Sequence, residues 1–253
     1  MAAFELQFSQ VDDHTQQFGT DIRPVLQVAD EKDSLHRFFG WASDRYPSLF
    51  ETAEMSRTQF SIKKLFIFPG KGQIELRTFT MTSRGPVFIF PHKVVAVQEE
   101  LEWPNPPEIF QDCLDEFRKR FPVHMPVKVG VVHERVFNTG DVNSTDLLAS
   151  CVPRFRHATL ANLTLKLGFV REGKNVKVDM ESVRAMELRP SGSNGVARPS
   201  PGDFGLRVRT DVNNAEFCPL DGDAVAGIVR YAAKFDEGEL LELLNGGLAD
   251  ATH

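Results

Sequence analysis

The chain has 253 residues, of which 42% are hydrophobic and 25% charged. This length is enough for one large or two small domains to bury a core without disulfides or metals. The formal net charge of −6 at pH 7 disfavours binding to nucleic acid or to an anionic membrane surface, so we expect neither as a partner. The 21 Phe against 2 Tyr and 2 Trp indicate core filling more than a surface for ligand recognition.

The cysteines and the N-terminus point to a cytoplasmic protein. Three cysteines, Cys113, Cys151 and Cys218, are an odd number without CxxC spacing, which argues against a disulfide framework or a zinc knuckle. The first residues show no basic region followed by an apolar run, so we expect no signal peptide. No apolar run approaches the roughly 20 residues that span a bilayer. We therefore expect a cytoplasmic location and no cofactor.

The first half begins with a short strand over residues 4–8, where apolar and polar residues alternate. Residues 12–30 are polar and contain glycine and proline, which predicts a loop. Asp30 is the expected N-cap of a helix that ends at Tyr46, because Pro47 forces the residue before it out of the helical region. The apolar residues of this helix are Leu35, Phe38, Phe39 and Trp41.

Three strands in a meander are expected next, over residues 59–68, 73–82 and 87–103, with turn-rich links between them. Pro91 must lie at an edge or a bulge, since proline has no N–H for the ladder. A second helix begins near Asn105. Its apolar face comprises Ile109, Phe110, Cys113, Leu114, Phe117 and Phe121.

After Pro122 the same order of elements returns. Residues 125–131 predict a strand, and Ser144 opens a helix that ends near Pro153. A second meander follows from Leu163, and Asp221 is the expected cap of a last helix. The apolar face of that helix contains Val225, Ile228, Val229, Ala232, Ala233 and Phe235.

The sequence therefore predicts an α+β fold with an internally duplicated β-α-β-β-β-α unit, in which antiparallel meander sheets carry helices on one face. Residues 1–122 form the first repeat. Residues 123–253 form the second, with a loop insertion at 189–202 and a C-terminal helical tail. The two sheets either join edge to edge or pack as two lobes about a pseudo-two-fold axis.

Catalytic motifs are absent from the sequence. It contains no GxGxxG, GxxxxGK[ST], HExxH, GxSxG or DxDxDG segment. The usual sequence motifs of nucleotide-binding proteins, zinc proteases, serine hydrolases and calcium-binding proteins are therefore missing. His133 and Glu134 are successive residues of a strand and point to opposite faces, which prevents them from serving one site as a pair. The remaining pocket candidates are five polar residues drawn from facing strands: His133, Glu134, Arg135, Arg207 and Asp211.

We expect a non-catalytic binding or scaffold protein that acts through a protein partner or through self-assembly into a homo-oligomer. Arg189 and Arg198, in the insertion that breaks the internal symmetry, are the expected partner contacts. The alternative is an enzyme or a small-molecule-binding protein with a pocket between the halves, built from the five candidates. A polar-lined cavity of several hundred Å³ would favour the pocket, and a flat apolar patch above roughly 600 Å² would favour a protein interface.

Overall fold

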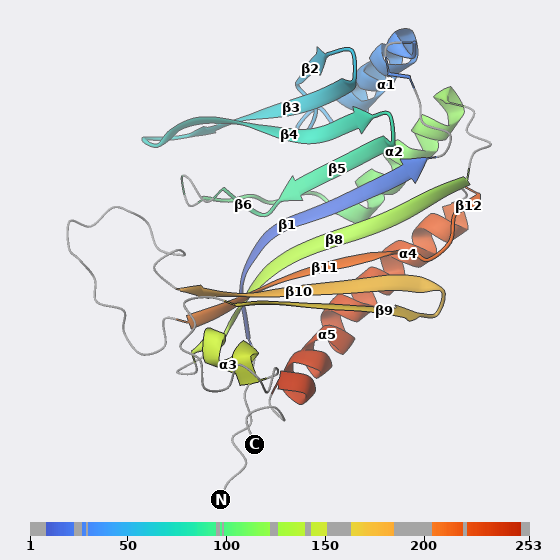
Figure 1. Ribbon diagram of the computed structural model, residues 1–253. Helices are drawn as coiled ribbons and strands as arrows, with labels where there is room; N and C mark the ends of the chain where they lie inside the picture. Colours follow the sequence, from blue (N-terminus) through green and yellow to red (C-terminus); the bar gives the residue numbers. More distant parts are fainter. Residues whose placement is uncertain are drawn as a thin grey trace, which may run out of the picture.

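The computed structural model describes residues 9–22, 27–28, 30–94, 97, 99–121, 126–139, 143–150, 163–184, 204–219 and 222–248. Within these residues the fold is α+β: a large antiparallel sheet carries a few helices (Figure 1). The predicted fold class is confirmed at this level. Residues 4–8, Cys151, the expected helix end at Pro153, the insertion 189–202 and the expected cap Asp221 lie outside the described residues.

The elements follow one another as strand, helix, meander and helix, twice. The first series is β1 (Ser9–Ile22), α1 (Lys32–Arg45), β2 (Thr52–Met55), β3 (Gln59–Phe68), β4 (Gly72–Thr82), β5 (Gly85–Pro91), β6 (Lys93–Val94), β7 (Glu99–Glu100) and α2 (Pro106–Arg120). The second is β8 (Pro126–Asn138), α3 (Ser144–Ser150), β9 (Thr164–Arg171), β10 (Lys174–Arg184), β11 (Phe204–Asn214), β12 (Cys218–Pro219) and α4 (Gly222–Lys234). From α4 the chain stays helical through η3 (Phe235–Glu239), α5 (Leu240–Glu242) and η4 (Leu243–Leu248), where η3 and η4 are π-helical turns.

One ten-stranded sheet joins both halves. Its order is β2-β3-β4-β5-β1-β8-β11-β10-β9, with β12 paired to the end of β8. The halves meet edge to edge where β1 runs antiparallel to β8, from Ser9 opposite Asn138 to Ile22 opposite Val127. Of the two arrangements considered from the sequence, the described residues form the continuous sheet.

The loop expected over residues 12–30 is wrong for residues 12–22, which belong to β1. This segment is rich in Asp, Gln and Thr, so its composition argues against a strand. It pairs with β5 on one side and β8 on the other, and these two ladders outweigh its weak strand propensity. Phe18, Thr20 and Ile22 are buried at every second position. This alternation is typical of a strand, although the composition of the segment is polar.

Other boundaries differ by a few residues. Helix α1 begins after Glu31, which makes no side-chain cap, so the expected cap at Asp30 is wrong. The strand expected over residues 87–103 ends at Pro91, and the short β6–β7 hairpin follows. Proline ends the ladder there because it has no N–H to donate.

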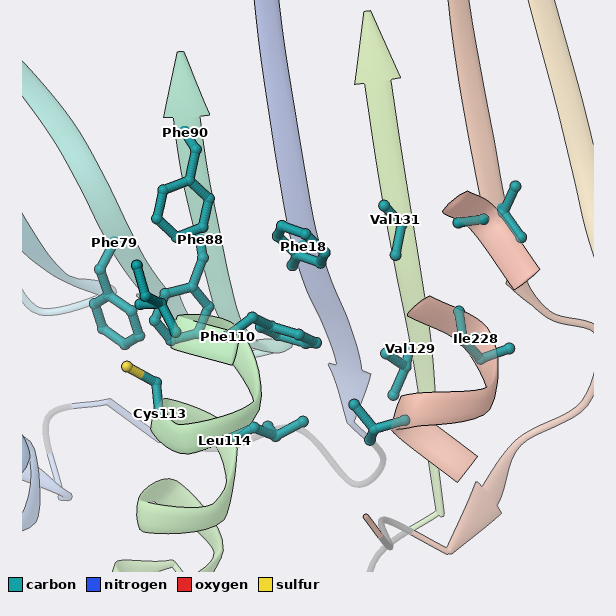
Figure 2. Packing of buried hydrophobic residues seen from close by; sticks show 14 of the residues in the cluster. Phe18, Phe79, Phe88, Phe90, Phe110, Cys113, Leu114, Val129, Val131 and Ile228 are labelled. Carbon is teal, nitrogen blue, oxygen red and sulfur yellow. The ribbon is translucent and has the colours of Figure 1, made fainter. Parts of the chain in front are cut away.

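Phenylalanine rings join helix α2 to the sheet (Figure 2). The Phe110 ring stacks on Phe18 of β1 with centroids 5.0 Å apart and meets Phe88 of β5 edge to face at 5.5 Å. Ile228 of α4 lies over Val129 and Val131 of β8 beside it (Figure 2). The two helices therefore cover the β1–β8 seam from the same side.

Replacing Phe117 by Ala tests the predicted apolar face of α2. Phe117 is 1% exposed and packs against Phe38 of α1 and Phe121. We expect Phe117→Ala to lower the free energy of unfolding by about 3–5 kcal/mol, because it opens a cavity in the core. Chemical denaturation measures the loss. Lys119→Ala, on the same helix with a side chain 73% exposed, is the control, and an equal loss in both variants would contradict the assignment.

Candidate functional site on the open face of the sheet

The described helices pack on one face of the sheet, which we call the helix face. Strand register places Val212, Val131, Phe18 and Phe88 in one row across β11, β8, β1 and β5. Residues of this face meet α1, α2, α3 and η3 through the pairs Phe79–Phe38, Phe18–Phe110, Ser182–Thr145 and Phe169–Phe235. The side chains between these positions point to the other face, which we call the open face.

The five pocket candidates do not converge on one site. His133 lies opposite Thr210, and Arg135 lies opposite Val208, so both belong to the helix face. Glu134, Arg207 and Asp211 occupy the alternating positions and belong to the open face. A single pocket built from all five is therefore not formed.

The two helix-face candidates meet a carboxylate that the sequence did not single out. Asp236, in the π-helical turn η3, lies 2.5 Å from Arg135 Nη2 and 3.1 Å from His133 Nδ1 through its two carboxylate oxygens. The Thr210 hydroxyl donates to Asp236 Oδ1 at 3.0 Å, and Arg135 Nη1 donates to the Asp236 carbonyl at 3.2 Å. These contacts tie the C-terminal helix to β8 and β11.

This buried cluster fits an anchor better than a reaction centre. The side chains of Arg135 and Asp236 are 7% exposed and that of His133 is 13% exposed. Both Asp236 oxygens already contact protein groups, and a buried arginine needs such a counter-ion to offset its desolvation. Within the ranges that the structure describes, no group of three or more His, Cys, Asp or Glu side chains is arranged to hold a metal.

The open face carries a hollow of about 540 Å³ over β9, β10 and β11. It is lined by Lys166, Leu167, Gly168, Lys177, Asp179, Arg209 and Asp211. A Cβ added at Gly168 would meet nothing within 4 Å, so the floor of the hollow is open above this glycine.

Charges of both signs alternate along the hollow, and the two carboxylates are already engaged. Lys166 Nζ lies 3.4 Å from Asp179 Oδ2, and Asn213 Nδ2 donates to Asp211 Oδ1 at 3.0 Å. Lys177 and Arg209 are exposed, and neither makes an ion pair with any other described residue. The hollow therefore presents two unpaired cations to solvent.

Two of the open-face candidates pair with each other beside the hollow. Arg207 Nε lies 3.7 Å from Glu134 Oε1, and Arg207 Nη1 donates to Glu181 Oε2 at 3.2 Å. Glu134 and Arg207 are thus committed to an ion-pair cluster, whereas Asp211 lines the hollow itself. The partner contacts expected at Arg189 and Arg198 lie outside the described residues.

Apolar side chains are exposed at the edge of the sheet next to the hollow. Phe169 is 37% exposed and Val170 is 67% exposed, both in the edge strand β9. The only other large apolar residues exposed among the described ones are Leu65 and Ile67, in β3 near the opposite edge. Val170 points to the open face beside the hollow, whereas Phe169 belongs to the helix face.

Cys113 offers no reactive thiolate at this surface. Cys113 lies on the apolar face of α2 and is fully buried, and burial raises the pKa of its thiol. Burial likewise raises the pKa of the Tyr231 hydroxyl, on α4. Neither group faces the hollow.

No protein-family model matches this chain, and a search of curated proteins finds no significant match. Among the described helices, none is long and apolar enough to cross a membrane. The geometry of the site therefore carries the functional argument by itself.

Sequence reasoning missed Asp236, Thr210, Lys177 and Arg209. For Lys177 and Arg209 the sequence did contain a pattern. In the segments 177–179 and 209–211, a cation and a carboxylate flank one residue that points to the helix face. On paired antiparallel strands this pattern places Lys177 opposite Asp211 and Asp179 opposite Arg209. For Asp236 no local pattern indicated that a residue near the end of a helix would be buried.

Asp236→Asn tests the anchor. We expect it to lower the free energy of unfolding by about 3–5 kcal/mol, because it leaves the buried Arg135 guanidinium without a counter-ion. Glu237→Gln is the matched control, since the neighbouring carboxylate is exposed. Denaturant titration measures the unfolding midpoint of both variants. Equal midpoints would show that the Arg135–Asp236 pair does not stabilise the position of the helix.

Proposed function

We propose that this chain is a non-catalytic binding protein whose protein partner docks on the open face of β9, β10 and β11. The observation that carries the proposal is the hollow with its two unpaired cations, Lys177 and Arg209. Unpaired charge on a surface lined by strands is suited to recognition of a complementary polypeptide.

The character of the charged groups favours binding over catalysis. An acid–base catalyst needs titratable groups held together in a site that excludes water. Here the carboxylates of the hollow are bound by Lys166 and Asn213, and Lys177 and Arg209 face solvent. The buried His133 and Asp236 pair lies on the other face, tied to Arg135 and Thr210.

The hollow has the polar lining and the volume expected of the alternative, a small-molecule pocket, but it lies over β9, β10 and β11 of the second half and not between the halves. The seam between the halves is the ladder of β1 and β8, and α2 and α4 cross it on the helix face, where Gln111 Nε2 donates to the Gly222 carbonyl at 3.2 Å. Backbone pairing and packed side chains occupy the space that such a pocket would need.

The charge of the hollow indicates an acidic segment of the partner. Three cations and two carboxylates line it. Because Lys166 pairs with Asp179, Lys177 and Arg209 remain against one carboxylate, Asp211, which accepts a hydrogen bond from the neutral Asn213 amide. Asp211 lies opposite Lys177 and Asp179 lies opposite Arg209, so an acidic side chain of the partner would reach the two cations from the solvent side. Such surface attraction weakens as salt screens it, with a Debye length of about 8 Å at physiological ionic strength.

We also infer that the two halves, residues 1–122 and 123–253, arose by internal duplication. Support comes from the element order and from the strand order β3-β4-β5-β1 followed by β8-β11-β10-β9, which is symmetric about the seam. We expect a superposition of the described parts of the two halves to match strand, helix, meander and helix in order and direction. Opposed strand directions in the matched elements would contradict the duplication.

A photo-reactive amino acid placed at position 177 tests the docking face. On irradiation in native extract, we expect the full chain carrying it in place of Lys177 to form an adduct with a second protein. The control carries the same group in place of Glu237, which is exposed on the helical side. Adding Arg209→Glu should reduce the adduct about threefold, because a surface charge contact contributes up to about 1 kcal/mol. Equal adducts from both positions, or none from position 177, would contradict the docking face.

A further inference from the structure

Along the outer edge of β9, the backbone groups of every second residue have no partner among the residues that the structure describes. The turn between β9 and β10 has two residues with positive φ, Glu172 at 50° and Gly173 at 71°, as in a type I′ hairpin. In such a hairpin the closing pair, Arg171 and Lys174, is hydrogen-bonded, and bonded pairs alternate from there. At the far end the Ser182 amide donates to the Leu163 carbonyl at 3.2 Å, which agrees with this alternation. The amides and carbonyls that point outward therefore belong to Thr164, Lys166, Gly168 and Val170.

This edge has few of the usual protections against pairing. Strand β9 contains no proline, its register with β10 is unbroken from Thr164 to Arg171, and its two cations, Lys166 and Arg171, are each paired with a carboxylate. Sheet edges are normally protected by short strands, bulges, prolines or charges that prevent such pairing. The opposite edge has these features. Strand β2 has only 4 residues, the register of β3 with β4 shifts between Ile62 and Lys63, and Lys63 is held between Glu54 and Glu75.

We propose that a second copy of this chain pairs its β9 antiparallel to this edge, with Leu167 opposite the copy's Leu167, so that the chain forms a two-fold dimer with one continuous sheet. The proposal goes beyond the docking of a separate partner and does not depend on it. Two observations carry it: the outward backbone groups of β9, and the exposure of Phe169 and Val170 on the same strand.

The side chains of β9 select this register. With Leu167 at the centre, Leu165 faces the copy's Phe169, and Lys166 faces the copy's Gly168. The outward amides then pair with one another, as an antiparallel ladder requires. A shift in one direction would oppose Lys166 to itself, which like-charge repulsion disfavours. A shift in the other direction would place Leu165 opposite Arg171.

Pairing in this register continues both faces of the sheet. On the helix face, the half-buried Leu165 and Leu167 and the exposed Phe169 would gain apolar neighbours from the copy. On the open face, Lys166 and Gly168 line the hollow, so the copy's Lys166 would lie beside the open space over Gly168. The ion pair of Lys166 with Asp179 reduces the charge at the centre of the interface.

The hollows of the two copies would be contiguous in the dimer. A partner with two acidic segments would then bind both hollows, and the second contact would gain from a high effective concentration.

Molar mass in solution tests the dimer. We expect light scattering on the full chain at micromolar concentration to give twice the 28.4 kDa of one chain. Gly168→Pro should give the mass of one chain with an unchanged unfolding midpoint, because the amide that it removes points outward and the added carbons enter open space. Ile67→Asp, at an exposed apolar position of β3, should remain dimeric. A monomeric native chain, or a dimer that persists in a folded Gly168→Pro variant, would overturn the proposal.

Cysteine cross-linking tests the register independently of that variant. Under mild oxidation, Leu167→Cys should form an intermolecular disulfide, because the two-fold axis brings residue 167 beside itself at a non-hydrogen-bonded pair. Gly168→Cys and Lys166→Cys should not exceed the background of the native chain, since each would meet itself only in a shifted register. Preferential cross-linking of either control variant over Leu167→Cys would overturn the register.

The two proposals fail separately. If the chain is monomeric and the photo-reactive group at position 177 still captures a different protein, the dimer is wrong and the docking face stands. If the chain is dimeric through β9 and position 177 yields no adduct with another protein, the separate partner is wrong and the dimer stands.

Discussion

The antiparallel pairing of β1 with β8 is the constraint on which the rest of the structure depends. Both strands lie at the centre of the sheet, so β1 is paired on both sides from Thr15 to Gly19 and β8 is paired on both sides from Gly130 to Asn138. Because the seam is a ladder, the two halves cannot rotate as separate lobes without breaking it. It also places α2 and α4 side by side, where Phe110 and Ile228 share one core (Figure 2).

The one-sided covering of the sheet follows from the same arrangement. Each series of elements places its helices on the helix face, so one apolar core forms there, while many polar side chains of β9, β10 and β11 alternate onto the other face. On β9, β10 and β11 those polar side chains include the paired Lys166 and Asp179, and two further cations, Lys177 and Arg209, against one further carboxylate, Asp211. A surface of this kind is suited to recognition, and it adjoins the edge strand where the apolar exposure lies.

The buried polar cluster explains how the C-terminal helix stays on the sheet. Asp236 lies in the first π-helical turn, and such turns recur at sites where a helix must place one residue specifically. Its carboxylate meets Arg135, His133 and Thr210 from two neighbouring strands. Apolar contacts alone would permit several positions of this helix on the sheet. A buried ion pair with directional hydrogen bonds permits one position, because any of its groups left unpaired would carry the full desolvation cost.

The sequence by itself determined the α+β class, α1, α2 and both meanders, because periodic apolar residues such as Leu35 and Phe38, or Val176 and Val178, report which side of an element is buried. It also separated His133 from Glu134, since successive strand residues point apart. Only the tertiary structure decided that the polar segment of β1 is a central strand, that Asp236 neutralises Arg135 101 residues earlier in the chain, and that β9 is an edge. These features arise from pairing between segments distant in sequence, and a local pattern holds no information about which strand will lie beside which.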